Sequence, residues 1–380
     1  FIHSMTKRRF FEIIAGIFWA GLLLHGTVVW VHSQEKKVNL AHLIHADSLV
    51  FRKQGNNNVL TFLGNVYFKK GSKSVTCEET VYYRQKEMAV FKGRVMMNDS
   101  GRILRADEII YYQNPEREMA RGSVEFRNKG KKIQSGFLTY TDTQSRLLAT
   151  QNVVFRDSVN AIELLADSLI YWVDKDYGEA KGHPKLFKRD STGAVEIEIQ
   201  AKKLAYNGNK SLAVALEKVK ITKGDVVSFA AKAKYYNLAH KIVITGKPKV
   251  YQRGDKMKAD TIEIFVKGKF LDRVHLIGRG RMSSIVHVDK KALEDWLSGQ
   301  NIWLSFKEDT LQKVIVKDQA VSLYHVVENG KLKGENQVLG DWLKIQFEKG
   351  EVNHVIIKST PGKSRGKFYP PGAKITPVKP

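Results

Sequence analysis

The chain has 380 residues, of which 43% are hydrophobic, and it carries a formal net charge of +24 at neutral pH. This length suffices for two or three ordinary domains or for one long repeat array, and the hydrophobic content excludes wholesale disorder. The positive charge favours an acidic partner, namely nucleic acid, an anionic membrane surface or a phosphorylated glycolipid, and charge alone does not choose among them.

Residues 1–33 are predicted to be a signal peptide or a membrane anchor. Met5 is the expected initiator, residues 7–9 are basic, and residues 13–31 are largely apolar. Residues 31–33 have the form of a cleavage site. The apolar stretch is also just long enough to span a bilayer. A cleaved signal and a retained anchor therefore both stay open, and either one predicts export.

Residues 34–288 contain two interlocked repeats. A glycine–valine element lies at 64–68, 93–97, 122–126 and 151–155, with looser copies at 182–187, 217–221 and 246–251. A second element, which often begins with Ala-Asp and ends with apolar residues, lies at 46–51, 106–111, 135–140, 166–171, 201–206 and 259–264. Repeats at a fixed step predict stacked units that share one core.

Both elements are predicted to be β-strands. Val, Ile, Phe and Tyr fill them, and the apolar positions lie two apart, so one face of each strand is apolar. The glycines suit bends or bulges. Each unit is thus predicted to add one strand to each of two stacked antiparallel sheets, and the open ends of the stack would present unpaired strand edges for another copy or a related protein.

The last third changes its period. Residues 259–278, 299–318 and 340–359 align at steps of 40 and 41, and each has the form of a β-hairpin. Residues 289–357 are therefore predicted to continue the stack, with a short helical turn at 290–297. Residues 358–380 hold six basic residues, no acidic residue and five prolines. This predicts a solvated basic tail, with packing of its first part left open.

The alternation defines a candidate lining on the inward apolar face. If the sheets close, this face is only a core; if they splay, it is a groove for an acyl chain. The candidate residues are Leu49, Phe51, Val66, Phe68, Val95, Met97, Ile109, Tyr111, Val124, Phe126, Leu138, Tyr140, Val153, Phe155, Leu169, Tyr171, Leu204 and Tyr206.

The run NVLTFLGNVYFKKGSKSVTCEETVYY, residues 58–83, closely resembles the OstA/LptA family of lipopolysaccharide-transport proteins. The ordered series of Gly-Asn-Val and Ala-Asp-x-Leu/Ile-x-Tyr strands carries the resemblance over residues 40–371. It implies a V-shaped β-jellyroll in the periplasm whose apolar interior shields the acyl chains of lipopolysaccharide. It further implies that lipid A is bound and that jellyrolls join end to end by strand pairing, with a homo-oligomer left open.

No constellation of reactive residues is present. The sequence lacks HExxH, GxSxG, P-loop and CxxC motifs, and its single cysteine, Cys77, excludes a cysteine-rich zinc site. Asp47, Asp107, Asp167 and Asp260 recur with the repeat, so they are predicted to be structural. We therefore expect no enzymatic activity, no cofactor and no metal.

Two alternatives to a lipopolysaccharide carrier stay open. A structural or adhesive envelope protein would have the same repeats, a closed core and no lipid cargo. A carbohydrate-processing β-solenoid would need paired carboxylates at a defined spacing, whereas the acids here follow the repeat. Nucleic-acid binding is not expected, because the aromatic residues lie within the strand alternation and not among the basic clusters.

Overall fold

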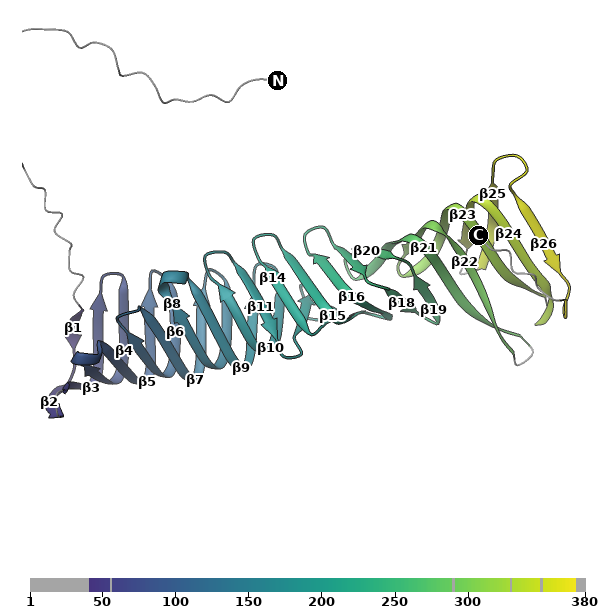
Figure 1. Cartoon of the computed structure of the whole chain (residues 1–380). Helices are drawn as coiled ribbons and strands as arrows, with labels where there is room; N and C mark the ends of the chain where they lie inside the picture. Colours follow the sequence, from purple (N-terminus) through teal and green to yellow (C-terminus); the bar gives the residue numbers. More distant parts are fainter. Residues whose placement is uncertain (1–40, 55–56, 289–290, 329, 349–350, 374–380) are drawn as a thin grey trace, which may run out of the picture. The chain divides into compact units, whose positions relative to one another are not determined.

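Antiparallel strands in chain order make up almost all of the structure, a computed structural model that describes residues 41–54, 57–288, 291–328, 330–348 and 351–373 (Figure 1). These residues belong to the compact unit Leu40–Pro380, and the predicted leader lies outside them. Within the described ranges, the helical elements are the 3-10 turns η1 (Arg84–Lys86) and η2 (Asp142–Gln144), and no helix is suited to cross a membrane. The predicted all-β fold is confirmed.

The first strands are β1 (His42–His45), β2 (Ser48–Gln54), β3 (Asn57–Lys70), β4 (Lys73–Tyr83), β5 (Met88–Asp99), β6 (Arg102–Tyr112), β7 (Arg117–Asn128), β8 (Lys131–Thr141), β9 (Arg146–Asp157) and β10 (Ile162–Trp172). Shorter strands follow: β11 (Tyr177–Lys181), β12 (Lys185–Arg189), β13 (Val195–Gln200), β14 (Lys203–Asn207), β15 (Leu212–Lys223), β16 (Val226–Tyr236), β17 (Lys241–Thr245), β18 (Lys249–Gln252), β19 (Asp255–Lys258) and β20 (Thr261–Lys267). The last are β21 (Phe270–Val288), β22 (Lys291–Lys307), β23 (Thr310–Glu328), β24 (Lys331–Glu348), β25 (Glu351–Lys358) and β26 (Arg365–Tyr369).

Alternate long strands carry a bulge in their middle, opposite a single residue of the neighbouring strand. In β5, Gly93 and Arg94 have φ values of 76° and 45°, and the two together oppose the single residue Asp107 of β6. The same two-against-one step recurs in β3, β7, β9 and β15. Glycine adopts positive φ without steric cost, and a bulge of this kind kinks the strand. The glycine–valine element of the sequence is therefore the corner of the fold.

The corners divide the ladder into two facing layers. In β5, residues 88–92 lie in what we call the first layer, and residues 95–99 lie in the second layer. The layers face each other, since the ring centroids of Tyr140 in the first layer and Phe126 in the second are 6.1 Å apart. The hairpin ends of both layers lie along the edge opposite the corners, and we call this edge the mouth.

One detail of the predicted repeat is corrected. A unit of two strands adds two half-strands to each layer instead of one whole strand, because the corner carries every strand from one layer to the other. At two corners Pro184 and Pro248 interrupt the strand, as expected for a residue that lacks a backbone donor. There β10 pairs with both β11 and β12, and β16 pairs with both β17 and β18.

The C-terminal strands continue the ladder with longer hairpins. The predicted helical turn at residues 290–297 is wrong, because residues 291–297 belong to β22 and Leu293 pairs with Val286 of β21. Pairing with the neighbouring strand overrides a local helical pattern. Within the segment predicted as a tail, β26 pairs with residues 335–339 of β24, so part of that segment adds a strand to the second layer.

Candidate functional site

The space between the two layers is the candidate site, and most of the predicted lining lies there. Phe68 and Tyr111 are half-buried and 14 predicted residues are buried, whereas their contact with a lipid stays a prediction. The buried ones are Val66, Val95, Met97, Ile109, Val124, Phe126, Leu138, Tyr140, Val153, Phe155, Leu169, Tyr171, Leu204 and Tyr206.

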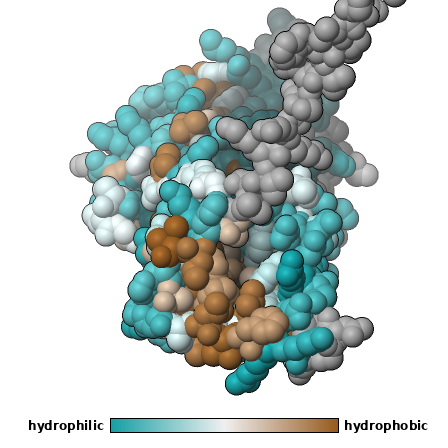
Figure 2. Space-filling model, turned by 90° about the vertical axis from the view of Figure 1, so that its left-hand side faces the viewer, coloured by the Kyte–Doolittle hydropathy of each residue, from teal (hydrophilic) through white to brown (hydrophobic). Residues whose placement is uncertain are grey.

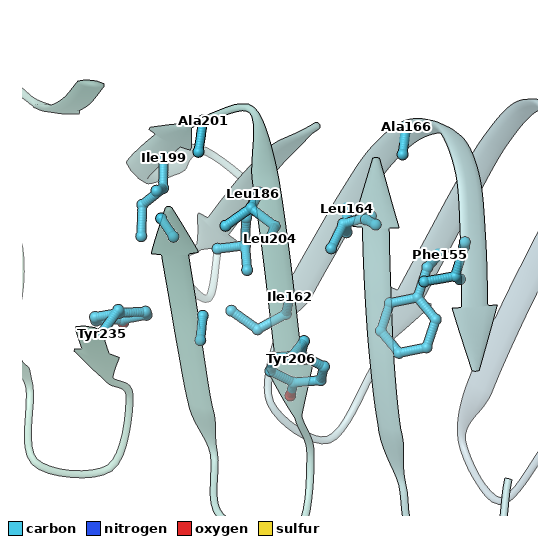
Figure 3. Close-up of a cluster of buried hydrophobic side chains, with 14 of the residues drawn as sticks. Phe155, Ile162, Leu164, Ala166, Leu186, Ile199, Ala201, Leu204, Tyr206 and Tyr235 are labelled. Atoms are coloured by element: carbon cyan, nitrogen blue, oxygen red, sulfur yellow. The ribbon is translucent and has the colours of Figure 1, made fainter. Parts of the chain in front are cut away.

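Side chains of the protein itself fill this interior over its middle part. Phe155 packs against Tyr171 and Tyr206, with ring centroids 5.5 Å and 5.8 Å apart. Ile162, Leu186 and Tyr206 point into the same space (Figure 3). The two layers are therefore in direct contact here, so a molecule can lie between them only if they move apart.

The N-terminal end leaves the same inward face uncovered. Leu49 and Phe51 of β2 are 56% and 60% exposed. Leu49 lies opposite the buried Phe62 in the β2–β3 pair, so it belongs to the inward face. Apolar residues gather on this end of the described structure within a polar rim (Figure 2). Leu43 of β1, 42% exposed and opposite Phe68, extends the patch and was missed by the sequence prediction.

The last strand of the first layer is uncovered in the same way. Val352, Val355 and Ile357 of β25 are 57%, 43% and 37% exposed. Ile357 lies opposite the buried Leu343 of β24, so this row faces inward as well. Both ends of the described ladder thus present apolar inward faces without a neighbouring strand to cover them.

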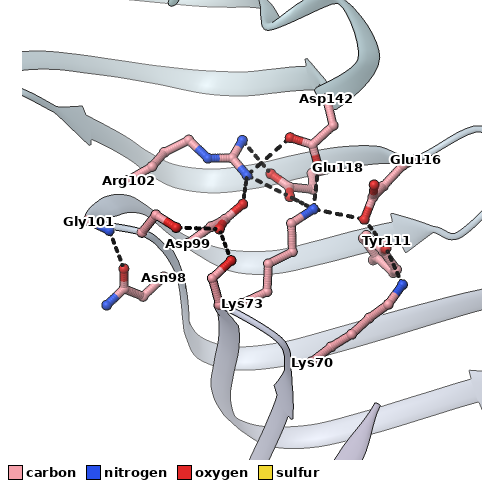
Figure 4. Close-up of polar contacts among 12 residues, drawn as sticks. Lys70, Lys73, Asn98, Asp99, Gly101, Arg102, Tyr111, Glu116, Glu118 and Asp142 are labelled. Carbon is pink, nitrogen blue, oxygen red and sulfur yellow. Dashed lines mark hydrogen bonds and ion pairs between the residues drawn. The ribbon is translucent and has the colours of Figure 1, made fainter. Parts of the chain in front are cut away.

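Ion pairs close the mouth near the N-terminal end (Figure 4). Lys73, at a hairpin end of the second layer, lies 2.9 Å from Glu116 and 3.5 Å from Glu118, and it also pairs with Asp142. Arg102, the next cation along this layer, lies 3.3 Å from Glu118 and 3.4 Å from Asp142. These three carboxylates belong to the first layer or its turns, so every one of these pairs joins the layers.

Burial sets the electrostatics of this cluster. The side chain of Glu118 is 2% exposed, and burial raises its pKa against the opposing effect of Arg102 and Lys73. Burial likewise raises the pKa of Glu116, but hydrogen bonds from Tyr111 and Lys73 outweigh it and lower that pKa overall. A buried carboxylate that loses its cation costs about 3–5 kcal/mol, so this cluster resists separation of the layers.

A second polar cluster closes the mouth further along the chain. Lys131 lies 3.0 Å from Asp157 of its own layer and 3.3 Å from Asp176 of the first layer. Tyr206 donates a hydrogen bond of 2.7 Å to Asp157, whose side chain is fully buried. Beside them, Asn237 Nδ2 donates to the carbonyl of Asn160 at 3.2 Å. We call these two clusters together the polar seam.

The sequence prediction missed the polar seam, although a signal for it exists. Lys73, Arg102 and Lys131 follow one another at the same step of 29 residues as the glycine–valine element. Each of them contacts at least one carboxylate of the other layer. For Lys73, two of these carboxylates lie 43 and 69 residues away in the sequence. The 29-residue spacing in the sequence therefore reveals the recurring cations but does not identify the carboxylates that they contact.

The recurring aspartates cover the corner glycines. An added Cβ at Gly122 would lie 2.2 Å from the carboxylate of Asp107, and one at Gly182 would lie 2.2 Å from that of Asp167. The same contact joins Asp47 to Gly64 and Asp260 to Gly278. This explains why the two sequence elements recur together, since each acid occupies the space that a side chain would take. Among the described residues, no group of three or more His, Cys, Asp and Glu is arranged to hold a metal ion.

Comparison with known proteins identifies the family of the repeat region. Residues 36–144 match the family described as OstA-like protein, and residues 132–270 match the family described as LptA/(LptD N-terminal domain) LPS transport protein. LptH from Pseudomonas aeruginosa, described as the LptA-homologous periplasmic component of a lipopolysaccharide transport device, is similar over 37% of this chain and 80% of its own, with 12% identity and a TM-score of 0.18. No curated protein matches the chain. Over residues 36–270, the chain therefore belongs to the OstA/LptA-like family of lipopolysaccharide-transport proteins.

Proposed function

We propose that the protein carries lipopolysaccharide across the periplasm as a non-enzymatic bridge component, with the acyl chains held between the two layers. The observation that carries the proposal is the unbroken apolar inward face, which runs from β2 to β25 in a chain whose repeat region belongs to a transport family. Burying a methylene group contributes about 0.8 kcal/mol, so about ten methylenes of one acyl chain contribute about 8 kcal/mol.

The cargo enters by parting the layers along the mouth. In the closed arrangement Phe126 and Leu138 have no exposed surface, so the interior has no room for an added chain. The corners are covalently continuous, whereas side-chain contacts hold the layers together at the mouth. These contacts include the polar seam and further hydrogen bonds, such as that from Lys223 Nζ to the carbonyl of Gly268. Breaking one buried ion pair costs about 3–5 kcal/mol. Opening the mouth breaks several such pairs and the packing between the layers, so the burial of several acyl chains has to offset these losses.

The net positive charge and the uncovered strands at the two ends of the ladder also support the transport of lipopolysaccharide. A net charge of +24 attracts the phosphate groups of lipid A as a diffuse field. The uncovered rows at β2 and β25 suit strand addition by a second copy or a related jellyroll. Contacts of this kind would make one continuous apolar path from copy to copy.

A crosslink across the mouth tests the proposal. In a Cys77→Ser background, cysteines replace Lys73 and Asp142 and are joined by a short bis-maleimide, which holds the two layers together. The matched control joins cysteines at Lys73 and Asp99, which pair within the second layer. We expect the first crosslink to lower the binding of lipopolysaccharide at least tenfold and the control to leave it unchanged. Equal binding by both crosslinked proteins would refute admission through the mouth.

The closed interior favours a second candidate, a structural envelope protein without cargo. Val124 is 2% exposed and lies inside the second layer. The structural function predicts that Val124→Trp destabilises the fold and has no other effect. The carrier function predicts that the same substitution abolishes lipopolysaccharide binding by the protein that still folds.

A further inference from the structure

Among the described corner glycines with positive φ, one lacks the carboxylate that covers the others. Five corner glycines with positive φ lie beside an acid, and at Gly246 the methyl group of Ala231 takes that place. Ala231 is the positional equivalent of the acids, because its backbone N–H donates to the carbonyl of Gly246 as Asp167 N–H donates to Gly182. The five covered glycines and their acids are Gly64 with Asp47, Gly93 with Glu78, Gly122 with Asp107, Gly182 with Asp167 and Gly278 with Asp260.

The missing acid leaves a cation unpaired. At three covered corners the acid also contacts the side chain that follows the glycine. Glu78 bonds to Arg94 at 2.7 Å, and Asp260 bonds to Arg279 at 2.6 Å; Asp47 bonds to Asn65 in the same way. The residue after Gly246 is Lys247, which is exposed and has no ion pair among the described residues.

This corner opens into a basic cavity of about 660 Å³. Its lining includes Lys247, Lys249, Lys258, Arg279 and Arg281, and Asp260 is the one acid in that lining. Arg279 already neutralises this acid. In the described part of the chain, the three lysines form no ion pair, so the cavity keeps an excess of positive charge that its walls concentrate.

We propose that this cavity binds a phosphorylated sugar. Lysine ammonium groups bind phosphate as point charges, and the volume lies within the usual range for sites of small molecules. Gly246 lies at the corner, opposite the mouth, so the site is separate from the interior proposed for acyl chains. The sugar phosphate belongs either to a glycolipid headgroup or to a soluble molecule, and both sources present the same group to the lysines.

Titration calorimetry on the full chain tests the site with two probes, glucose 1-phosphate and phosphatidylethanolamine vesicles that contain lipid A. Ala231→Asp restores the missing carboxylate beside Lys247, and Lys247→Gln/Lys249→Gln/Lys258→Gln removes the unpaired cations. The matched control, Lys69→Gln/Lys92→Gln/Lys181→Gln, changes the net charge equally at exposed lysines outside the cavity. Circular dichroism confirms that each variant folds.

We expect saturable binding of at least one probe to the unaltered protein. Both cavity variants should bind it at least tenfold more weakly, and the control should bind it equally well. Binding of glucose 1-phosphate alone supports a soluble ligand, and binding of the lipid A vesicles alone supports a glycolipid headgroup. No saturable binding of either probe, or an equal loss in the control, would overturn the site without affecting the crosslinking result at the mouth.

Discussion

The region β3–β10 and the region β21–β26 are built from the same corners and differ at the mouth. In β3–β10, ion pairs such as Lys73 with Glu118 and Lys131 with Asp176 join the two layers. Among the described residues of β21–β26, no ion pair does so; for example, His325 pairs with Asp295 and Glu335 of its own layer. The comparison shows that closure is a local property of the hairpin ends and not of the strand ladder.

The exposure of apolar side chains also differs between these two regions. Ile109 and Phe126 in the sealed region have no exposed surface. In the longer hairpins, Tyr324 lies on the inward face, two residues from the Ser322 that opposes the buried Leu297, and it is 38% exposed. The C-terminal region therefore has less packing to lose when the layers separate. If the protein carries acyl chains, we expect this region to open first.

The largest expected effect concerns the core of the sealed region. Phe126→Ala leaves a cavity between the layers and should lower the free energy of unfolding by about 4 kcal/mol. The matched change in the last strand, Val355→Ala, removes a side chain that is 43% exposed and should cost less than about 1 kcal/mol. Denaturant unfolding measures both values, and similar losses would contradict the difference in packing.

The second largest loss in the free energy of unfolding is expected from a substitution in the polar seam. Arg102→Ala leaves Glu118 buried without its guanidinium partner, so we expect a loss of about 3 kcal/mol in the free energy of unfolding and faster amide exchange at the ends of β6 and β7. The control Arg94→Ala breaks an ion pair whose arginine is 89% exposed and should change stability by less than about 0.5 kcal/mol. Unchanged amide exchange in Arg102→Ala would show that the cluster does not hold the mouth.

The corner glycines should give a smaller loss. Gly122→Ala forces a Cβ into a position 2.2 Å from Asp107 at a φ of +74°, and we expect a cost of about 2 kcal/mol. Gly101→Ala has a similar φ of +88° in open space, so it should cost about 1 kcal/mol. Thermal unfolding of the two variants side by side separates the contact with the acid from the backbone strain.

The pH dependence should be the smallest effect. Burial alone would raise the pKa of Asp157, but hydrogen bonds from Asn160 and Tyr206 lower it overall. The unfolded state then binds the proton more tightly, so this carboxylate stabilises the fold above its unfolded pKa of about 4, and this contribution is lost as the pH falls through the lowered folded value. Glu118, whose pKa is raised, acts in the opposite direction. The melting temperature should therefore fall more steeply below pH 4 in the unaltered protein than in Asp157→Asn, and parallel curves would contradict this role.

The sequence predicted the strands and the inward face because both depend on local periodicity. Val66 and Phe126 were placed correctly since alternation assigns a face to each position, and the glycine–valine step located the corners. The partners of Lys73 could not be predicted, because they depend on which half-strands face each other across the mouth. The exposure of Leu49 and Phe51 could not be predicted either, since it depends on where the ladder ends and not on the pattern within a strand.

The central claim is that acyl chains lie between the layers, and photocrosslinking in cells tests it most directly. A photoreactive amino acid replaces Phe68 or Phe126 on the inward face, or Lys69 or Lys129, which are exposed. The account predicts lipopolysaccharide adducts at Phe68 and Phe126 and none at the two lysines. Adducts at the lysines alone, or at no position in a folded protein, would contradict a lipid-carrying interior and leave the repeats as a closed structural stack.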